Sequence, residues 1–235
     1  PGDKCNSKSI NFMAKHGRGL ICLALSKDQT DKLKLPLMSR TNKSRMQTAF
    51  TISIEARKGI STGISAYDRA KTIKVAINPR AKKKDIVSPG HVFPLVARSG
   101  GVLERAGHTE ASVDISKLSK LNPSAVICEV MNEDGRMARL KDLQKFSKKH
   151  KIKIASIEDL IAYRLRNEKL IFKVSNKLIN YRRNIKYEYL TYENKLDESE
   201  NFAIKKGKFK LNRSVRVRVI STKLKKSKNI FNDLN

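Results

Sequence analysis

Thr48–Ile73 reads TAFTISIEARKGISTGISAYDRAKTI and holds a strand pattern, a glycine loop and a helix pattern in succession. Apolar and polar residues alternate in Phe50–Ala56, which is the period of a strand with one buried face. After the loop Gly59–Gly63, apolar residues recur every three or four positions in Ala66–Ile77, as they do in an amphipathic helix. This succession favours a fold that combines strands with helices.

The chain before this stretch repeats the alternation, and the chain after it is rich in breakers. Asn6 or Ser7 can cap a short helix with a left-handed exit at Gly17, and the apolar run Gly19–Leu25 is typical of a buried strand. Asn78–Gly101 carries many Pro and Gly residues, so we expect loops there rather than one long element.

Further strand and helix patterns continue until the composition changes near Leu170. Ala125–Met131 is typical of a buried strand, Leu140–His150 of a helix and Ile152–Ile154 of a short strand, after which Ser156 can cap another helix. The main body is therefore expected to be α/β or mixed α+β.

The chain divides by composition into three parts. We expect a main domain over residues 1–168, a polar and basic linker over 169–200, and a small β-containing appendage over 201–235. Within the appendage, Phe202–Phe209 and Ser214–Ser221 (SVRVRVIS) carry strand patterns.

The formal net charge of +29 suggests a polyanionic partner. A basic RNA-binding protein, with Ser214–Ser221 and the Lys223–Lys228 cluster as its surface, is therefore one reading of the sequence. We do not expect nucleic acid as a partner, however, because aromatic residues make up only 6% and no binding motif interleaves them with the cations.

The apolar runs and the cysteines of the sequence indicate in which cellular compartment the protein is expected. No run approaches the roughly 18–20 apolar residues that cross a bilayer, so we expect no membrane span. Cys5, Cys22 and Cys128 are odd in number and lack CxxC spacing, which excludes a disulfide framework and fits a reducing cytoplasm.

Arg105–Glu110 (RAGHTE) gathers groups that suit an anion and a metal ion. Arginine binds phosphate with two donors, a neutral imidazole binds divalent cations, and glycine lets backbone amides approach oxygen atoms. A turn with a surface histidine explains the same residues without a ligand. His91, in the constrained PGHVFP loop, is either functional or a hydrogen-bonded structural residue.

Glu129 interrupts an apolar strand pattern, so its carboxylate must be exposed at a sheet end, paired, or held with a raised pKa. It is a candidate general acid or base, and the alternative is an edge strand with Glu129 facing water. Thr62 and Ser65 lie where a glycine loop enters a helix, a geometry that favours anions, although Ser65 is equally explained as a helix cap.

Four stretches in the same order closely resemble 3,4-dihydroxy-2-butanone 4-phosphate synthase of riboflavin biosynthesis. They are Thr48–Ile73, Pro89–Ile115 (PGHVFPLVARSGGVLERAGHTEASVDI), Pro123–Leu140 (PSAVICEVMNEDGRMARL) and Ile157–Arg164 (IEDLIAYR). The resemblance implies a lyase that converts D-ribulose 5-phosphate to formate and 3,4-dihydroxy-2-butanone 4-phosphate with Mg²⁺ or Mn²⁺. It also implies a three-layer α/β/α fold around a mixed sheet, and a homodimer with active sites near the subunit interface.

The resemblance assigns roles residue by residue. It makes His108 a metal ligand, His91 and Glu129 residues needed for turnover, and Thr62 a substrate contact, with Glu129 on the substrate as well. The residues that would contact the sugar phosphate are Arg105, Ala106, Gly107, His108 and Thr109.

The sequence departs from the family pattern at both ends. The family has an acidic segment of the form DDEDRENEGD with a metal-binding glutamate, whereas this chain starts at Pro1 and its Gly2-Asp3 pair is too close to the first helix to replace it. We therefore expect a fragment that binds metal poorly and has impaired activity.

The C-terminal part resembles the start of a GTP cyclohydrolase II half. Arg164–Val174 and Ser214–Ser221 carry this likeness, but Ile220-Ser221-Thr222 replaces an expected His-Ser-Glu and no zinc cysteines follow. We expect no cyclohydrolase activity. A noncatalytic scaffold for the riboflavin pathway is a further alternative function.

Overall fold

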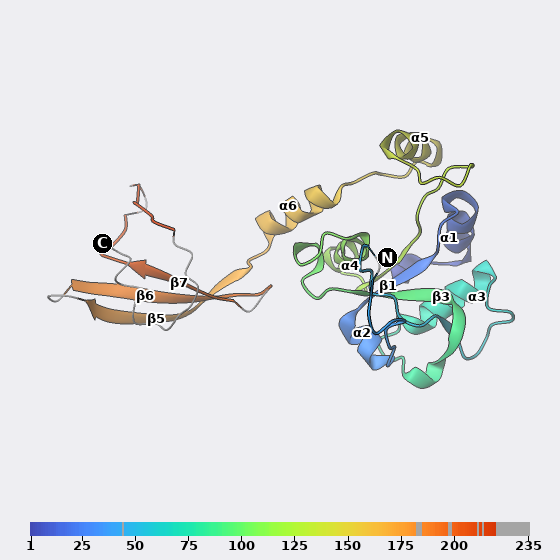
Figure 1. Cartoon of the computed structure of the whole chain (residues 1–235), viewed down its shortest axis with the longest axis horizontal. Coiled ribbons are helices and arrows are strands. Elements are labelled where there is room, and N and C mark those ends of the chain that lie inside the picture. The colour runs from blue at the N-terminus through green and yellow to red at the C-terminus, as the bar shows by residue number, and fades with distance from the viewer. Residues whose placement is uncertain (44, 182–184, 197–198, 211, 213, 220–235) are drawn as a thin grey trace. The chain divides into compact units, whose positions relative to one another are not determined.

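The structure is a computed structural model of residues 1–235, and it describes all of them except 44, 182–184, 197–198, 211, 213 and 220–235. The chain forms two compact units (Figure 1). The larger unit holds residues 1–170 and 195–198, and the smaller unit holds 171–194 and 199–235. Each unit is described by itself.

Four strands form the mixed sheet of the larger unit, in the order β2-β3-β1-β4. The strands are β1 (Cys22–Ser26), β2 (Ile54–Ala56), β3 (Ile86–Ala97) and β4 (Ser124–Ile127). β1 runs parallel to β3 and antiparallel to β4, while β2 runs antiparallel to β3. The first strand in the chain thus lies inside the sheet, and β4 lies at its edge.

Helices cover both faces of this sheet, which gives three layers. α1 (Ser7–Phe12) and α3 (Ala66–Ala76) pack on one face, where the larger core contains Ile10, Leu23, Leu25, Ile54 and Ile73. α4 (His108–Leu118) packs on the other face, where Ala24, Ala97, Val113 and Ala125 form a second core. The expected α+β architecture, a three-layer α/β/α arrangement with a mixed sheet, is confirmed.

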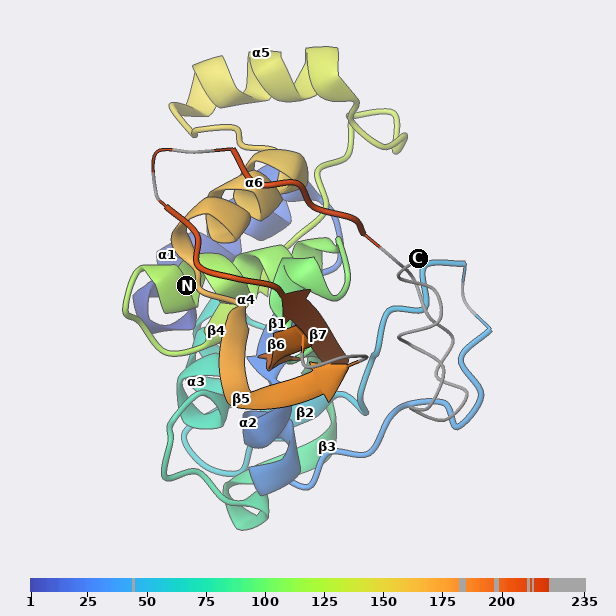
Figure 2. The ribbon, with the colours of Figure 1, turned by 90° about the vertical axis from the view of Figure 1, so that its left-hand side faces the viewer.

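Short elements and two further helices complete the larger unit. They are η1 (Gly2–Lys4), η2 (Met13–Gly17), α2 (Lys27–Lys32), η3 (Lys83–Asp85), η4 (Gly101–Leu103), α5 (Leu140–His150) and α6 (Ile157–Asn167). Figures 1 and 2 both show α5 at the margin of this unit, away from the sheet. None of the helices in the described residues has the length and apolar composition that crossing a membrane requires.

Side-chain caps begin three helices where the sequence predicts them. Asn6, Ser65 and Ser156 each accept a hydrogen bond from the backbone amide three residues ahead, which satisfies a donor that the first turn leaves unpaired. The expected left-handed exit at Gly17 is wrong by one position. Gly17 ends the π-helical turn η2, and Arg18 has the positive φ of 68°.

The expectation of loops throughout Asn78–Gly101 is wrong, because β3 runs unbroken through much of this segment. Ile54 pairs with Val92 but Glu55 pairs with Val87, so Ser88–His91 bulge out on the β2 side. A bulge accommodates Pro and Gly within a strand because its residues have no ladder partner there.

The expected strand at Ile152–Ile154 is also absent from the structure, which describes these residues fully. Lys151 has a φ of 54°, and the Ile152 amide donates to the Ser147 carbonyl at 3.0 Å. Ile152 therefore closes the end of α5, as residues after a left-handed helix cap commonly do.

The smaller unit contains an antiparallel sheet in the order β5-β6-β7. Its strands are β5 (Ile171–Tyr181), β6 (Ile185–Asn194) and β7 (Glu200–Lys205), so the small β-containing appendage is confirmed. Residues 169–200 hold two of these strands rather than a linker. The linker was predicted from the polarity of these residues, but side chains on a small sheet are largely exposed to water and can be polar as well. Within Ser214–Ser221, residues 214–219 form no strand, and the remainder lies outside the described residues, as does Lys223–Lys228.

Candidate functional site

A pocket of about 360 Å³ lies where β3 ends and α4 begins. It is lined by Arg45, Met46, Gln47, Arg98, Arg105, Ala106 and Gly107. The lining comes from three separate segments, each of which contributes one arginine. Gly107 is the N-cap of α4 and makes no side-chain cap, so the amides of the first turn face the same region as these guanidinium groups.

Arg105 is held on two sides inside this pocket. Its Nη1 atom donates to Glu110 Oε2 at 2.6 Å, and its Nη2 atom donates to the Met46 carbonyl at 2.8 Å. Glu110 is only 1% exposed, and its other carboxylate oxygen accepts a hydrogen bond from the Arg98 amide. A buried carboxylate needs such partners, so Arg105 compensates Glu110 while it fixes the loop that carries Met46.

The remaining residues of RAGHTE open α4. His108 is its first residue and is exposed, whereas Thr109 is buried. Ala106 is exposed and Gly107 is partly buried beside the Arg105 guanidinium. The structure thus brings together all five residues predicted to contact a sugar phosphate, but it presents His108 to solvent and turns Thr109 inward.

His91 and Glu55 form a second group, on the bulge between β2 and β3. His91 Nδ1 contacts Glu55 Oε1 closely, with side chains 45% and 16% exposed respectively. The carboxylate orients the ring and, in the neutral imidazole, favours the proton on Nδ1. The Nε2 atom is then left as an acceptor, which is the form that a general base requires.

The glycine loop before α3 packs against this pair. Gly63 has a φ of 84°, and a Cβ atom there would lie 2.8 Å from His91 Nδ1 and still closer to Glu55. Only glycine fits this approach. Thr62 is the exposed neighbour of Gly63 in this loop, and its contact with the substrate stays a prediction.

Glu129 follows the edge strand β4 and is exposed. Its Oε2 atom accepts a hydrogen bond from the Leu20 amide at 2.9 Å. Of the three situations that the sequence allows, the structure shows a carboxylate at a sheet end, next to water and partly satisfied by one backbone donor.

Cys22 lies near Glu129 and is buried at the start of β1. Burial, together with the charges of Glu129 and Cys128, raises the pKa of the Cys22 thiol to about 12. The thiol is therefore protonated at neutral pH and acts as a neutral neighbour of the carboxylate.

The strand register shows at which end of the sheet each predicted site residue lies. Cys22, at the start of β1, pairs with Phe93 of β3 and with Ile127 of β4. His91 lies two residues before Phe93, and Glu129 lies two residues after Ile127. Because β3 runs parallel and β4 antiparallel to β1, both residues lie at the end of the sheet where β1 begins, one on each side of β1. The arginine pocket adjoins Arg98, beyond the opposite end of β3. At about 3.3 Å per residue, the two ends lie on the order of 20 Å apart, so one chain does not join all the predicted site residues.

A divalent metal ion needs several ligands that converge on one point. Within the described residues, no three His, Cys, Asp or Glu side chains come together in a way that could hold a metal ion. His108 is accessible as one ligand, but Glu110 beside it is buried and paired with Arg105. The described residues therefore do not fit a complete metal site.

The structure places several residues in these groups that the sequence patterns did not indicate. In the sequence Glu55 is one polar position of FTISIEA, and only the structure shows that it faces His91. Arg45 and Arg98 carried no motif, and their proximity to Arg105 depends on how the chain folds. Glu110 is part of RAGHTE, and its position in the first turn of α4 could have signalled a partner for Arg105.

Comparisons with known proteins agree with the fold. The family model for 3,4-dihydroxy-2-butanone 4-phosphate synthase matches residues 1–163. A riboflavin biosynthesis protein, RibBA, of Aquifex aeolicus is 51% identical over 93% of this chain and 54% of its own length.

Two solved structures are similar as well. A two-domain 3,4-dihydroxy-2-butanone 4-phosphate synthase from A. baumannii is 44% identical, with a TM-score of 0.76 over 86% of this chain and 59% of that one. A synthase in complex with two magnesium ions is 36% identical, with a TM-score of 0.66 over 71% of this chain and 82% of that one.

The chain spans somewhat more than half the length of the Aquifex and A. baumannii relatives. The match nevertheless covers the whole larger unit up to α6, including the pocket, the His91–Glu55 pair and Glu129. The chain belongs to the 3,4-dihydroxy-2-butanone 4-phosphate synthase family.

Proposed function

We propose that the protein converts D-ribulose 5-phosphate to 3,4-dihydroxy-2-butanone 4-phosphate and formate in riboflavin biosynthesis. The observation that carries this proposal is the pocket with three arginines beside the first turn of α4, in a chain of this family. Guanidinium groups and helix-terminal amides are the usual ligands of a phosphate ester.

The reaction needs several proton transfers, because a ketose phosphate must be enolised, dehydrated, rearranged and cleaved. We assign one of them to His91, whose Nε2 atom is free to accept a proton while Glu55 holds the ring from the other side. The exposed carboxylate of Glu129 is a second acid or base in the same part of the sheet.

A divalent ion, Mg²⁺ or Mn²⁺, would stabilise the negative charge on enediolate oxygen atoms. A relative binds two magnesium ions, which supports Mg²⁺ for this protein too. His108 is the described residue that could supply one ligand, and the other ligands would have to come from groups outside the described set.

We infer that the working site forms between two copies of the chain. In one chain, His91 and Glu129 lie at the opposite end of the sheet from the arginine pocket. A homodimer that places the His91 end of one chain beside the pocket of its partner would complete the site, and C₂ symmetry would then give two equal sites.

Two further proposals concern the compartment and the C-terminal part. Cys5, Cys22 and Cys128 are all free thiols, which supports a reducing cytoplasm. No cysteine follows Cys128 in the chain, so we propose that residues beyond the family match carry no GTP cyclohydrolase II activity of the zinc-dependent kind.

The test is formate release from D-ribulose 5-phosphate by the full chain, measured with MgCl₂ and with EDTA. Because the described residues supply only part of a metal site, we expect weak, metal-dependent formate release. His91→Gln should lower it by about a further 100-fold, since general acid–base catalysis contributes roughly 10²–10⁴-fold. Arg40→Gln is the control, because this exposed residue lies outside both groups. Absence of formate at any metal concentration would overturn the proposal.

A further inference from the structure

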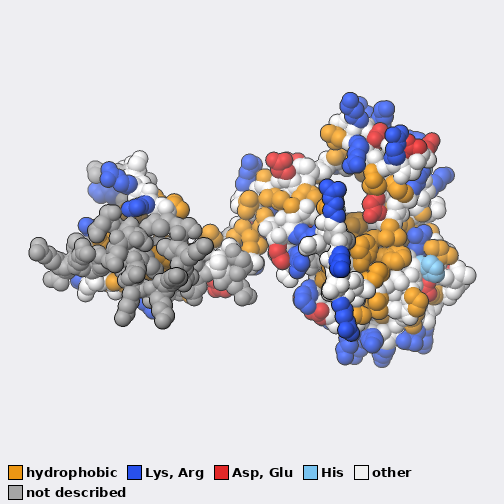
Figure 3. Space-filling view, in the orientation of Figure 1, with side chains coloured by type: hydrophobic (Ala, Val, Ile, Leu, Met, Phe, Trp, Pro, Cys, Tyr) orange, Lys and Arg blue, Asp and Glu red, His pale blue; other side chains and the backbone are white. Residues whose placement is uncertain are grey.

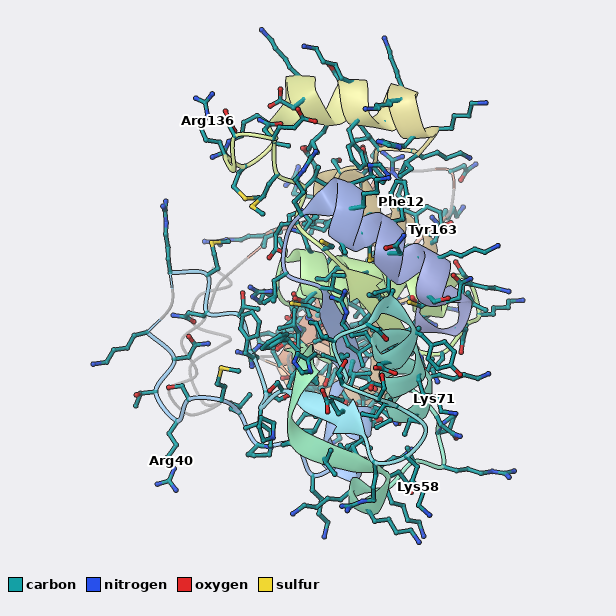
Figure 4. The ribbon with its side chains drawn as sticks, turned by 90° about the vertical axis from the view of Figure 1, so that its right-hand side faces the viewer. Phe12, Arg40, Lys58, Lys71, Arg136 and Tyr163 are labelled. Carbon is teal, nitrogen blue, oxygen red and sulfur yellow. The ribbon has the colours of Figure 1, made fainter. Side chains whose placement is uncertain are left out.

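A cluster of four aromatic rings joins α1 and the π-helical turn η2 to α5, outside both groups of the candidate site. The ring centroid of His150 lies 4.6 Å from that of His16 and 5.1 Å from that of Phe12. Phe146, one turn earlier on α5, lies 4.5 Å from His150. Figure 4 shows Phe12 on the side of α1 that faces α5. The imidazole of His150 therefore packs at the centre of the contact between these helices.

α5 depends on these rings for its attachment to the rest of the larger unit. None of its eleven residues is buried. In the described part of the chain, the hydrogen bonds of α5 run within the helix or to segments beside it in sequence, such as those from Asn132 to Asp142 and from Ser147 to the Ile152 carbonyl. A helix of this length is marginal in water without tertiary packing. Loss of the ring contacts should therefore unfold α5.

Positive charge surrounds the two imidazoles. Burial lowers the pKa of His16, and so do, in decreasing order, the charges of His150, Lys15, Lys149 and Arg18. Lys148 adds a further cation to the last turn of α5. The acids of the adjoining segment have other partners, namely Arg18 for Glu133, Arg136 for Asp134, and the Arg139 amide for Asp142. A proton added to the cluster thus meets cations rather than a carboxylate.

We propose that His16 and His150 form a pH-sensitive switch that holds α5 on α1 while both imidazoles are neutral and releases it when both carry a proton. Two imidazolium rings whose centroids lie 4.6 Å apart repel each other, and the neighbouring lysines add to the repulsion. Release exposes both cations to water, where the repulsion is screened. This inference does not depend on the proposed function, since neither histidine belongs to the candidate site.

Two effects favour a single imidazolium and set the order of events. His16 and His150 each lie in the last turn of a helix, where backbone carbonyls attract a cation, and the face of a phenylalanine ring attracts one too. The first proton is therefore tolerated, and the second one opens the contact.

The pH range of the switch follows from the direction of the shift. Because docking lowers the pKa of His16, the docked state is stabilised above the pKa of a released histidine, near 6.5. That advantage is lost as the pH falls from this value through the lower pKa of the docked histidine.

Hydrogen exchange of the full chain at about pH 7.5 and about pH 5, measured by mass spectrometry, tests the release without any ligand or turnover. Rates are corrected for the intrinsic pH dependence of exchange, with α4 as the reference because it has the same length and a buried face. The protection of α5 should fall about tenfold relative to α4 for each pH unit by which docking lowers the histidine pKa values. The Met131 amide, which donates to the Gly17 carbonyl at 2.9 Å, should keep its protection.

Variants that keep the ring separate charge from packing. His16→Phe and His150→Phe each retain an aromatic ring in the cluster but remove one site for a proton, so α5 should stay protected at both pH values. His108→Gln is the control, because it changes an exposed histidine outside the cluster and should show the full loss at the lower pH.

NMR titration of the histidine ring protons gives a second measurement. The pKa of His16 should lie below 6.5 in the unchanged protein and should rise in His150→Phe, which removes one of the charges that lower it. This titration decides the question if a ring variant loses the protection of α5 already at neutral pH.

Four results would contradict the switch. They are equal protection of α5 at both pH values in the unchanged protein, protection that increases as the pH falls, an equal loss in His16→Phe and in the unchanged protein, and a pKa of His16 that His150→Phe leaves the same.

Discussion

Asp68 shows how one buried carboxylate holds the glycine loop beside the candidate site. It is 2% exposed and accepts hydrogen bonds from the Ser61 hydroxyl at 2.8 Å and the Gly63 amide at 3.0 Å. Burial alone would raise the pKa of Asp68, but these hydrogen bonds and those from the Ser61 amide and Ser65 outweigh it and lower the pKa. The loop that carries Thr62 therefore depends on an ionised Asp68.

We expect Asp68→Asn to destabilise the protein at pH 7, by about 1–3 kcal/mol for the mismatched buried hydrogen bonds, as such losses usually cost. Because the folded state lowers the pKa, the ionised carboxylate stabilises the protein above the unfolded pKa, near 3.9. That advantage is lost as the pH falls from this value through the lower folded pKa. Urea unfolding of both proteins at pH 7 and pH 3 tests this, and an equal difference at both pH values would contradict it.

Cys22 gives a second prediction at the scale of one residue. Its pKa of about 12 comes first from burial and then from the charge of Glu129. Glu129→Gln removes that charge, so the pKa of the thiol should fall and alkylation at pH 9 should speed up. The rate of iodoacetamide labelling against pH, in a chain with Cys5→Ser and Cys128→Ser, measures this, and an unchanged profile would show that the two groups do not interact.

Arg164 attaches α6 to α4 and to the loop before it through three partners. It donates to Asp114 Oδ2 at 2.7 Å, to the Gly100 carbonyl at 2.8 Å and to both oxygens of Glu168. Gly101, with a φ of 64°, leaves the space in which Asp114 and Arg164 meet. The helix is therefore fixed to the same loop that leads into the arginine pocket.

Arg164→Met should lower the free energy of unfolding by about 3 kcal/mol, because removing one partner leaves the buried Asp114 carboxylate without its cation. Arg166→Met on the same helix is the matched control, since Arg166 is exposed, and it should change stability by less than about 0.5 kcal/mol. Chemical denaturation of the three proteins compares them. Equal stabilities for both variants would show that the anchor contributes nothing.

Local patterns predicted most elements of the larger unit, and their failures share a physical cause. The caps at Asn6, Ser65 and Ser156 depend on neighbouring backbone amides alone, so the sequence was sufficient to find them. The path of β3 through Pro89 depends on its pairing with β1 and on a bulge opposite β2, which are contacts between distant segments.

The candidate site shows the same limit. RAGHTE is one continuous segment, so its residues were found together, and their proximity at the start of α4 follows from chain order. Glu55 and His91 come from different strands, and Arg45 comes from a loop far before Arg105. Only the fold brings those side chains together, so no pattern in the sequence could reveal them.

At the scale of the whole molecule, the charged side chains are distributed over much of the surface. Figure 3 shows Lys and Arg side chains in several places on the visible face, among acidic and apolar side chains, with a group of hydrophobic side chains on the larger unit. Cations spread in this way are the solvated surface of a basic protein. The charge that carries the argument for function is the local excess in the arginine pocket.

A site shared by two chains predicts complementation between inactive variants. His91→Gln and His108→Gln change exposed residues at opposite ends of the sheet, and each should be inactive alone. In a mixed dimer, one of the two sites combines the unchanged His91 end of one chain with the unchanged His108 end of its partner. Random pairing should therefore restore about a quarter of the normal activity.

The measurement is formate release after the two variants are co-expressed. The control is a chain carrying both substitutions, co-expressed with the unchanged protein. Its mixed dimers contain no intact site, so about a quarter of the activity should remain, all of it from unchanged homodimers, whereas sites within single chains would leave about half. Activity that stays absent in the first mixture would show that both ends act within one chain or that the chains do not exchange.

The position of β1 inside the sheet has a consequence for how the protein is made. Cys22 has Phe93 on one side and Ile127 on the other, so the ribosome must translate about 100 residues beyond Cys22 before the second neighbour exists. Until then the apolar segment GLICLAL lacks a neighbour on at least one edge, where exposed strands of this kind favour aggregation. Chaperones that bind short apolar segments would find their target here.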